Sequence, residues 1–143
     1  MSKSIVKLAC GVLIMLITIA SASACTTEMA EPEYANQIVE TALQTMNDGD
    51  YTTHMELFTP EIQSAVTEAD FEEALQIIKD TIGDYIDKEF WKTETENIYT
   101  VVYYKANYSQ EPEDVIVTAY FEKIEGEVYI AGFWLDSPKL RGE

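Results

Sequence analysis

The chain contains a single histidine, His54, and this limits the catalytic sites that one chain can form. A multi-histidine metal site cannot be built, and no paired nucleophile accompanies His54 for a Ser-His-Asp or Cys-His arrangement. The residue falls on a predicted short helix between Tyr51 and Phe58. We therefore expect a partly exposed helix histidine rather than a general base.

Carboxylates are abundant, but their spacing predicts neither a metal site nor an acid–base pair. Asp48 and Asp50 form one local acidic cluster, and residues 111–114 contain another. Neither matches an EF-hand loop, whose oxygen ligands alternate over about twelve residues and end in Glu. The six glycines are scattered and form no phosphate-binding pattern. The sequence predicts no catalytic residue, no metal site and no cofactor.

Aromatic residues are the remaining candidates for a binding site. Six of them are predicted to line a pocket for an apolar or ring-shaped ligand: Tyr51, Phe58, Trp91, Tyr103, Tyr120 and Trp134. For any one of them, packing in the hydrophobic core is more common than lining a ligand pocket. Asn107 begins the sequon Asn107-Tyr108-Ser109, a candidate glycosylation site in a host that glycosylates exported proteins.

Residues 1–24 have the pattern of a signal peptide. Lys3 and Lys7 form a basic start, residues 8–20 are all apolar or small, and small residues follow at 21–24. The apolar run is shorter than the roughly 20 residues that span a bilayer. We therefore expect export and removal of this segment rather than a permanent membrane helix.

The segment Ala22-Ser23-Ala24-Cys25 resembles a lipobox, in which small residues precede a cysteine that is acylated after cleavage. The same residues also suit ordinary signal peptidase, which leaves free secretion as the alternative. Cys10 would be discarded, so Cys25 would be a lone thiol in an oxidising compartment, a liability unless modified. We expect a lipid on Cys25 that anchors the protein at the outer face of the cell membrane through a tether, residues 25–33.

The mature chain would be strongly acidic. Loss of Lys3 and Lys7 leaves 7 of the 9 basic side chains against 26 acidic ones, a net charge of about −19. Binding to DNA, RNA or another polyanion depends on basic side chains that neutralise phosphates. We exclude nucleic acid as a partner, whereas the charge does not choose between cationic partners and solubility alone.

Hydrophobic periodicity predicts three helices after the tether. The first covers about residues 34–47 and ends at Gly49. A short second helix is capped by Asp50. The third begins with a capping-box pattern at Thr67 and ends at Gly83.

Four strands rich in β-branched and aromatic residues follow the helices. They are predicted at residues 85–95, 98–108, 114–124 and 127–135. Short loops between them predict antiparallel pairing, and helices followed by a meander indicate the α+β class. We expect a single α+β domain at residues 34–137 and a C-terminal tail at 138–143. Both sheet faces are rich in apolar side chains, which leaves open which of them points inward.

This succession of elements is similar to that of the nuclear transport factor two-like superfamily. The residues that carry the resemblance are Ala35, Ile38, Val39, Leu43, Gly49-Asp50-Tyr51, Phe58 and Ile130-Ala131-Gly132-Phe133. More narrowly, the chain resembles the exported domain of unknown function 3887 family, found alone as lipoproteins or ahead of hydrolase domains. The resemblance implies a curved four-stranded sheet that wraps a helix as a cone, with a pocket in its mouth but no particular reaction.

Enzymes of the cone fold, such as ketosteroid isomerases and scytalone dehydratases, use an Asp or His base with tyrosine donors in the mouth. The resemblance makes Asp84 or Asp87 a candidate base. The candidate donors are Tyr103, Tyr104, Tyr120 and Tyr129. No acid–base pair falls at a defined spacing, and solvated aspartates with half-buried strand tyrosines are the more common arrangement.

Three hypotheses about function follow. The sequence favours non-catalytic binding of a small ligand or an envelope protein by the tethered domain. An isomerase or dehydratase acting on a small apolar substrate is one alternative, and a structural module that forms a homodimer through the sheet is another. A buried Asp with a raised pKa near tyrosine hydroxyls would favour catalysis. An apolar pocket without ionisable groups would favour binding, and a filled cone with an apolar outer sheet would favour assembly.

Overall fold

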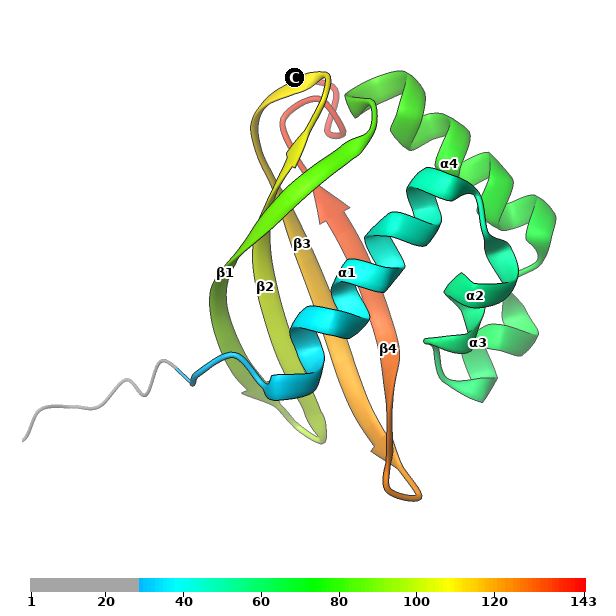
Figure 1. Ribbon diagram of the computed structural model, residues 1–143, viewed down its shortest axis with the longest axis vertical. Coiled ribbons are helices and arrows are strands. Elements are labelled where there is room, and N and C mark those ends of the chain that lie inside the picture. The colour runs from blue at the N-terminus through cyan, green and yellow to red at the C-terminus, as the bar shows by residue number, and fades with distance from the viewer. Residues whose placement is uncertain (1–28) are drawn as a thin grey trace, which may run out of the picture.

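The computed structural model describes residues 29–143, which form helices followed by a four-stranded sheet (Figure 1). The helices are α1 (Glu33–Asp48), α2 (Tyr51–Glu56), α3 (Pro60–Ala65) and α4 (Glu68–Ile82). The strands are β1 (Tyr85–Glu96), β2 (Tyr99–Tyr108), β3 (Glu111–Ile124) and β4 (Glu127–Asp136). The predicted α+β class is confirmed. The predicted signal peptide and Cys25 lie outside the described residues.

The ends of the helices follow the predicted capping signals. Gly49 adopts a left-handed φ of 71° after α1, and Asp50 accepts a hydrogen bond from the N–H of Thr53 at the start of α2. Thr67 and Asp70 form a reciprocal capping box at the start of α4. These local predictions are confirmed.

Helix α3 was not predicted from the sequence, where Thr59-Pro60 indicated only the end of the second helix. The Thr59 side chain caps α3, and Pro60 occupies its first position. Proline suits this position because its fixed φ is helical and its missing N–H would have had no helical partner. The same dipeptide therefore ends one helix and begins another.

The sheet is a meander of order β1-β2-β3-β4, in which each strand pairs antiparallel with the next. Irregularities in register between Phe90 and Lys92 and between Tyr120 and Phe121 accompany the curvature visible in Figure 1. The helices lie on one side of the sheet, with α1 crossing it.

One face of the sheet packs against α1 and forms the core, which answers the question that the sequence left open. The core includes Ala35, Val39, Ala42 and Leu43 from α1 and Val102, Tyr104, Ala106, Val115, Val117, Ala119 and Phe121 from the sheet. Because this core is continuous within residues 29–143, we expect this part of the chain to fold without the residues that precede it. None of its helices is long and apolar enough to cross a membrane.

Hydrogen bonds attach helix α4 to the rest of the domain near its two ends. Near its start, the Tyr51 hydroxyl donates to the carbonyl oxygen of Val66 at 2.7 Å. Near its end, Nζ of Lys79 donates to the carbonyl oxygen of Asn47 at 2.9 Å, and the N–H of Gln110 donates to Ile82. The middle of the helix is thereby held over the edge of the sheet near β4.

The connection between α2 and α3 pairs with the free edge of β4. The N–H of Ile130 donates to Leu57 at 2.8 Å, and the N–H of Thr59 donates back to Ile130 at 3.0 Å. Beyond β4, the predicted tail folds back on the domain, since the N–H of Lys139 donates to Glu111 and Leu140 packs against the core.

Candidate functional site

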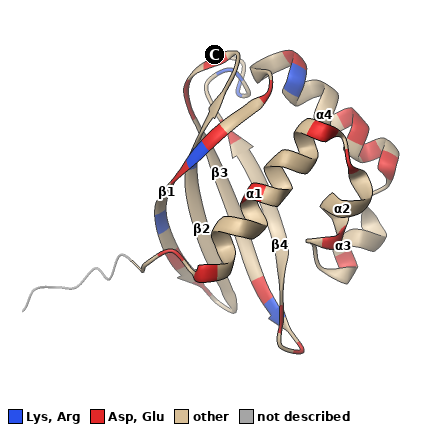
Figure 2. Cartoon of the chain, in the orientation of Figure 1, with Lys and Arg blue, Asp and Glu red and all other residues tan. Residues whose placement is uncertain are grey.

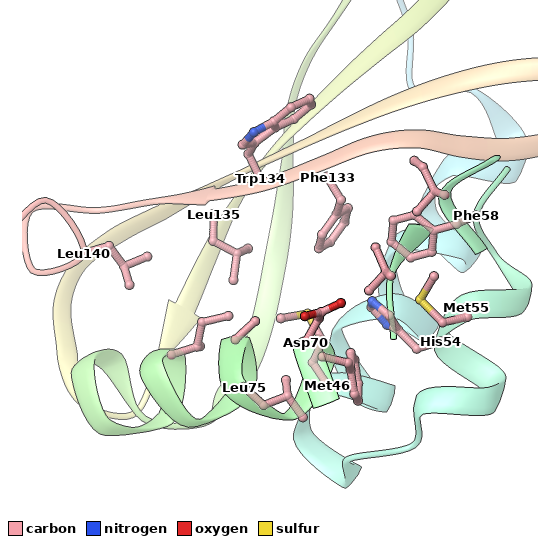
Figure 3. Close-up of a pocket in the computed structure, with 15 residues that line it drawn as sticks. Met46, His54, Met55, Phe58, Asp70, Leu75, Phe133, Trp134, Leu135 and Leu140 are labelled. Carbon is pink, nitrogen blue, oxygen red and sulfur yellow. The ribbon is translucent and has the colours of Figure 1, made fainter. Parts of the chain in front are cut away.

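A pocket of about 470 Å³ lies beneath the middle of α4, against β4 (Figure 3). This volume falls within the range of small-molecule sites in proteins. Residues from α1, α2, α3 and the C-terminal turn complete its wall. With the exception of His54 and Asp70, the side chains that line it are apolar.

Two periodic patterns create this apolar wall. Phe71, Leu75 and Ile78 recur at spacings of three and four on one side of α4 and face the pocket. From β4, Phe133 and Leu135 point into the pocket because alternate residues of a strand share a face. The stripe on α4 was predicted from the sequence, but the space between it and the sheet was not.

His54 is buried, with 6% of its surface exposed, so the prediction of a partly exposed histidine was wrong. Its Nδ1 lies 3.2 Å from the carbonyl oxygen of Ala42 and 2.9 Å from Oγ1 of Thr45. A carbonyl oxygen only accepts hydrogen bonds, so Nδ1 carries the proton. The centroid of the Phe71 ring lies 4.9 Å from that of the imidazole.

The environment of His54 keeps its side chain neutral. Burial lowers the pKa of His54 to about 4, and the hydrogen bond to Ala42 opposes this only in part. With Nδ1 protonated, Nε2 carries a lone pair and has no hydrogen-bond partner within residues 29–143. The pocket wall therefore includes one uncharged hydrogen-bond acceptor.

Asp70 contributes the only carboxylate that the described residues bring to the pocket wall. One of its oxygens accepts hydrogen bonds from the N–H of Thr67 at 2.9 Å and from its hydroxyl at 2.8 Å. These bonds hold the pKa of Asp70 below its usual value. The residue is exposed and ionised at neutral pH, and it both caps α4 and places a negative charge at the pocket.

Of the six aromatic residues predicted to line a pocket, Phe58 and Trp134 contribute to this one. Figure 3 shows the Trp134 indole on the side of β4 opposite Phe133. Tyr51 does not line the pocket, but its ring contacts Phe71. The other three lie on the far face of the sheet: Trp91, Tyr103 and Tyr120.

The candidate residues for a catalytic site are not brought together. Asp84 and Asp87 are exposed and do not line the pocket. Tyr104 points into the core, where burial and its hydrogen bond to Glu31 raise its pKa. Tyr129 is half-buried on β4 and is likewise absent from the pocket wall.

Asn107 of the sequon is exposed near the end of β2, where its side-chain amide donates to Asp87. No cluster of three or more His, Cys, Asp or Glu side chains that could hold a metal ion occurs in the described part of the chain.

A family described as protein of unknown function, DUF3887, matches residues 39–133, about two thirds of the chain. The chain belongs to this family. The match confirms the narrower resemblance predicted from the sequence, whereas the wider superfamily remains a prediction. No curated protein matches the chain.

The match to DUF3887 includes α2, α3 and α4 and runs into β4, so it covers most of the pocket wall. The acidic residues of this DUF3887 domain lie largely outside the pocket. Figure 2 shows them along α4, where Glu68, Glu72, Glu73 and Asp80 are exposed. Helix α4 thus separates an acidic outer surface from an apolar cavity.

Proposed function

We propose that this protein is a non-catalytic binding protein that holds a small, mainly apolar molecule between α4 and β4. The observation that carries the proposal is the composition of the pocket wall, which is apolar except for one imidazole and one carboxylate. The cavity of about 470 Å³ is lined in this way, so the replacement of its water by apolar ligand surface is favourable.

The two polar groups of the wall restrict the class of ligand. Neutral His54 can accept a hydrogen bond but cannot form an ion pair with an anion. Ionised Asp70 would repel a carboxylate or phosphate placed in the pocket. We therefore infer that the ligand is neutral or cationic, with an apolar body and a hydrogen-bond donor, and that fatty-acid anions bind poorly.

The same geometry supports binding over the isomerase or dehydratase alternative. A histidine with a pKa of about 4 is a weak base at neutral pH. The one carboxyl group that the described residues bring to the pocket wall, that of Asp70, is ionised and cannot act as an acid. The strand tyrosines that could have acted as donors lie in the core, outside the pocket wall on β4, or on the far side of the sheet.

Binding can be tested with the soluble chain that starts at residue 26 and the neutral fluorescent probe N-phenyl-1-naphthylamine. Ala74→Trp places an indole in the pocket, whereas Ala69→Trp changes an exposed position on the same helix outside the wall. We expect saturable binding to the unsubstituted chain and to Ala69→Trp, and at least tenfold weaker binding to Ala74→Trp. Dodecanol should displace the probe better than dodecanoate does. Equal binding by the two variants, or no saturable binding, would overturn the proposal.

We further propose that the protein is exported and anchored by a lipid on Cys25 at the outer face of the cell membrane. This proposal rests on the basic start, the apolar run and the lipobox pattern in residues 1–25. The intact mass of protein from the membrane fraction tests it: the chain should begin at a lipid-modified Cys25, and Cys25→Ala should be released or unprocessed. A freely secreted, unmodified chain would contradict it.

A further inference from the structure

The face of the sheet opposite the helices carries aromatic side chains that nothing in residues 29–143 covers. Trp91 and Trp134 are 45% and 56% exposed, and they come from the two edge strands β1 and β4. Between them, Tyr103 and Tyr120 project from the central strands on the same face. We call this surface the outer face.

Trp134 is held in a defined position on the outer face. A side chain at Gly132 would place its Cβ 2.4 Å from the six-membered ring of the Trp134 indole, so the ring lies directly over this glycine. The Tyr120 ring packs against the indole with its centroid 5.2 Å away and an interplanar angle of 71°. One side of the indole is thus supported by the backbone, and the residue remains largely open to solvent.

The tyrosines of the outer face are fixed by carboxylates. The hydroxyl of Tyr103 donates to Glu94, and the hydroxyl of Tyr120 donates to Glu96, both at 2.9 Å. Val101 lies on this face and is fully buried although no helix covers it. The aromatic and acidic side chains therefore form an ordered layer rather than a set of independent mobile rings.

A row of paired residues crosses the sheet on this face, and Tyr103 and Trp134 are its aromatic members. Lys92 pairs with Tyr103, Tyr103 with Thr118, and Thr118 with Trp134, so all four strands contribute to one row, next to Trp91. With strands about 4.8 Å apart, this row is about 14 Å long. Hydrogen-bonding groups flank it, since Nζ of Lys92 binds Glu94 at 2.6 Å.

The charges of this face argue against two kinds of occupant. Seven carboxylates are present, those of Asp87, Glu89, Glu94, Glu96, Glu122, Glu127 and Asp136, against the ammonium groups of Lys92 and Lys105. This negative excess repels polyanions, and it opposes a symmetric contact in which the face would meet its own copy. Two of the rings already have a cation over them, since Lys92 lies 4.4 Å from the Tyr103 ring centroid and Lys105 lies 5.0 Å from that of Trp91.

We propose that the outer face binds a neutral oligosaccharide, with the face of one sugar ring on Trp134, with the next sugars along the row towards Trp91, and with hydroxyl groups bonded to Glu94, Glu96 and Lys92. A pyranose ring has an apolar face of C–H groups and a rim of hydroxyls. It therefore matches exposed aromatic rings that alternate with fixed carboxylates, and it requires no net charge. This site lies on the face of the sheet opposite the helices, and Trp134 is the one residue named here that also lines the apolar pocket.

The proposal can be tested by titrating the soluble chain from residue 26 with chitohexaose, cellohexaose and maltohexaose, monitored by calorimetry and tryptophan fluorescence. We expect at least one hexasaccharide to bind with little dependence on salt concentration. Trp134→Ala and Trp91→Ala should each weaken binding at least tenfold. Gly132→Ala should do so as well, because it displaces the indole without removing it. Ile77→Ala, at an exposed apolar residue on α4, should bind normally.

Three results would overturn the proposal. The first is no binding to any of the three sugars at millimolar concentration, with circular dichroism confirming that the chain is folded. The second is sugar binding that all the tryptophan variants retain. The third is a dimer in sedimentation experiments that Trp134→Ala dissociates, since the outer face would then be an interface between copies.

Discussion

Nδ1 of His54 and Oγ1 of Thr45 lie 2.9 Å apart in the interior of the domain. The Thr45 hydroxyl can itself donate to the carbonyl oxygen of Thr41 at 2.8 Å, so it can accept from the imidazole. This contact joins α2 to the last turns of α1 and fixes one neutral form of the histidine. Charging the ring would require a second proton at a buried position that lacks a carboxylate partner.

The stability of the domain should therefore depend on pH through His54. Its pKa is about 6.5 when unfolded and about 4 when folded, so the unfolded chain takes up the proton first as the pH falls. The free energy of unfolding should decrease by about 2 kcal/mol between pH 7 and pH 5 from this residue alone. The contribution is fully present above about pH 6.5 and is lost as the pH falls towards 4.

Urea denaturation of the wild type and of His54→Asn at both pH values measures this effect. Asparagine keeps a donor for Ala42 but does not titrate, so the variant should lack the histidine's part of the pH dependence. Equal losses in the two proteins would contradict the assignment of a neutral, buried His54.

Gly83 is expected to be intolerant of a side chain. Its φ of 81° with ψ of −146° is a conformation that residues other than glycine rarely adopt. An added Cβ would also lie 3.2 Å from the backbone N of Gln110 and would clash with Oγ of Ser109. Gly83→Ala should lower the free energy of unfolding by about 2 to 4 kcal/mol. Gly126→Ala, at φ of 87° but in open space, should cost only about 1 kcal/mol. A smaller loss at Gly83 than at Gly126 would disprove the steric argument.

The cap of α4 should matter for both stability and binding. Thr67→Ala removes the hydroxyl that accepts from the N–H of Asp70 and donates to its carboxylate. We expect a loss of about 1 kcal/mol in thermal or urea denaturation. Because α4 forms one wall of the pocket, N-phenyl-1-naphthylamine should also bind more weakly. Thr52→Ala, at an exposed position on α2, is the matched control and should change neither quantity.

The hydrogen bond between Tyr104 and Glu31 should help to attach the start of the domain to the sheet. The Tyr104 hydroxyl, on β2, lies 2.6 Å from Oε1 of Glu31. Tyr104→Phe should reduce the free energy of unfolding by about 1 kcal/mol. Tyr129→Phe is the control and should change it negligibly, because the Tyr129 hydroxyl has no hydrogen-bond partner within residues 29–143. Hydrogen exchange near the start of α1 should increase in the first variant. No difference between the two variants would show that this contact contributes little.

Local signals in the sequence determined the ends of the main helices. Gly49 and the Thr67–Asp70 pair act on backbone groups within four residues of themselves, so their effects can be predicted without knowledge of the fold. The four strands and their antiparallel order were equally accessible, because alternation and short loops allow few other arrangements. Helix α3 was missed because Pro60 is compatible with both an end and a beginning.

Only the tertiary structure decided which residues form the site. His54 is buried because α2 packs against Thr45 of α1, and the pocket exists because contacts such as that of Lys79 with Asn47 hold α4 by its ends. The aromatic residues divide between two surfaces for a similar reason. The same residue types suit a core, a pocket wall and an exposed face, and the choice depends on which side of the sheet the helices cover.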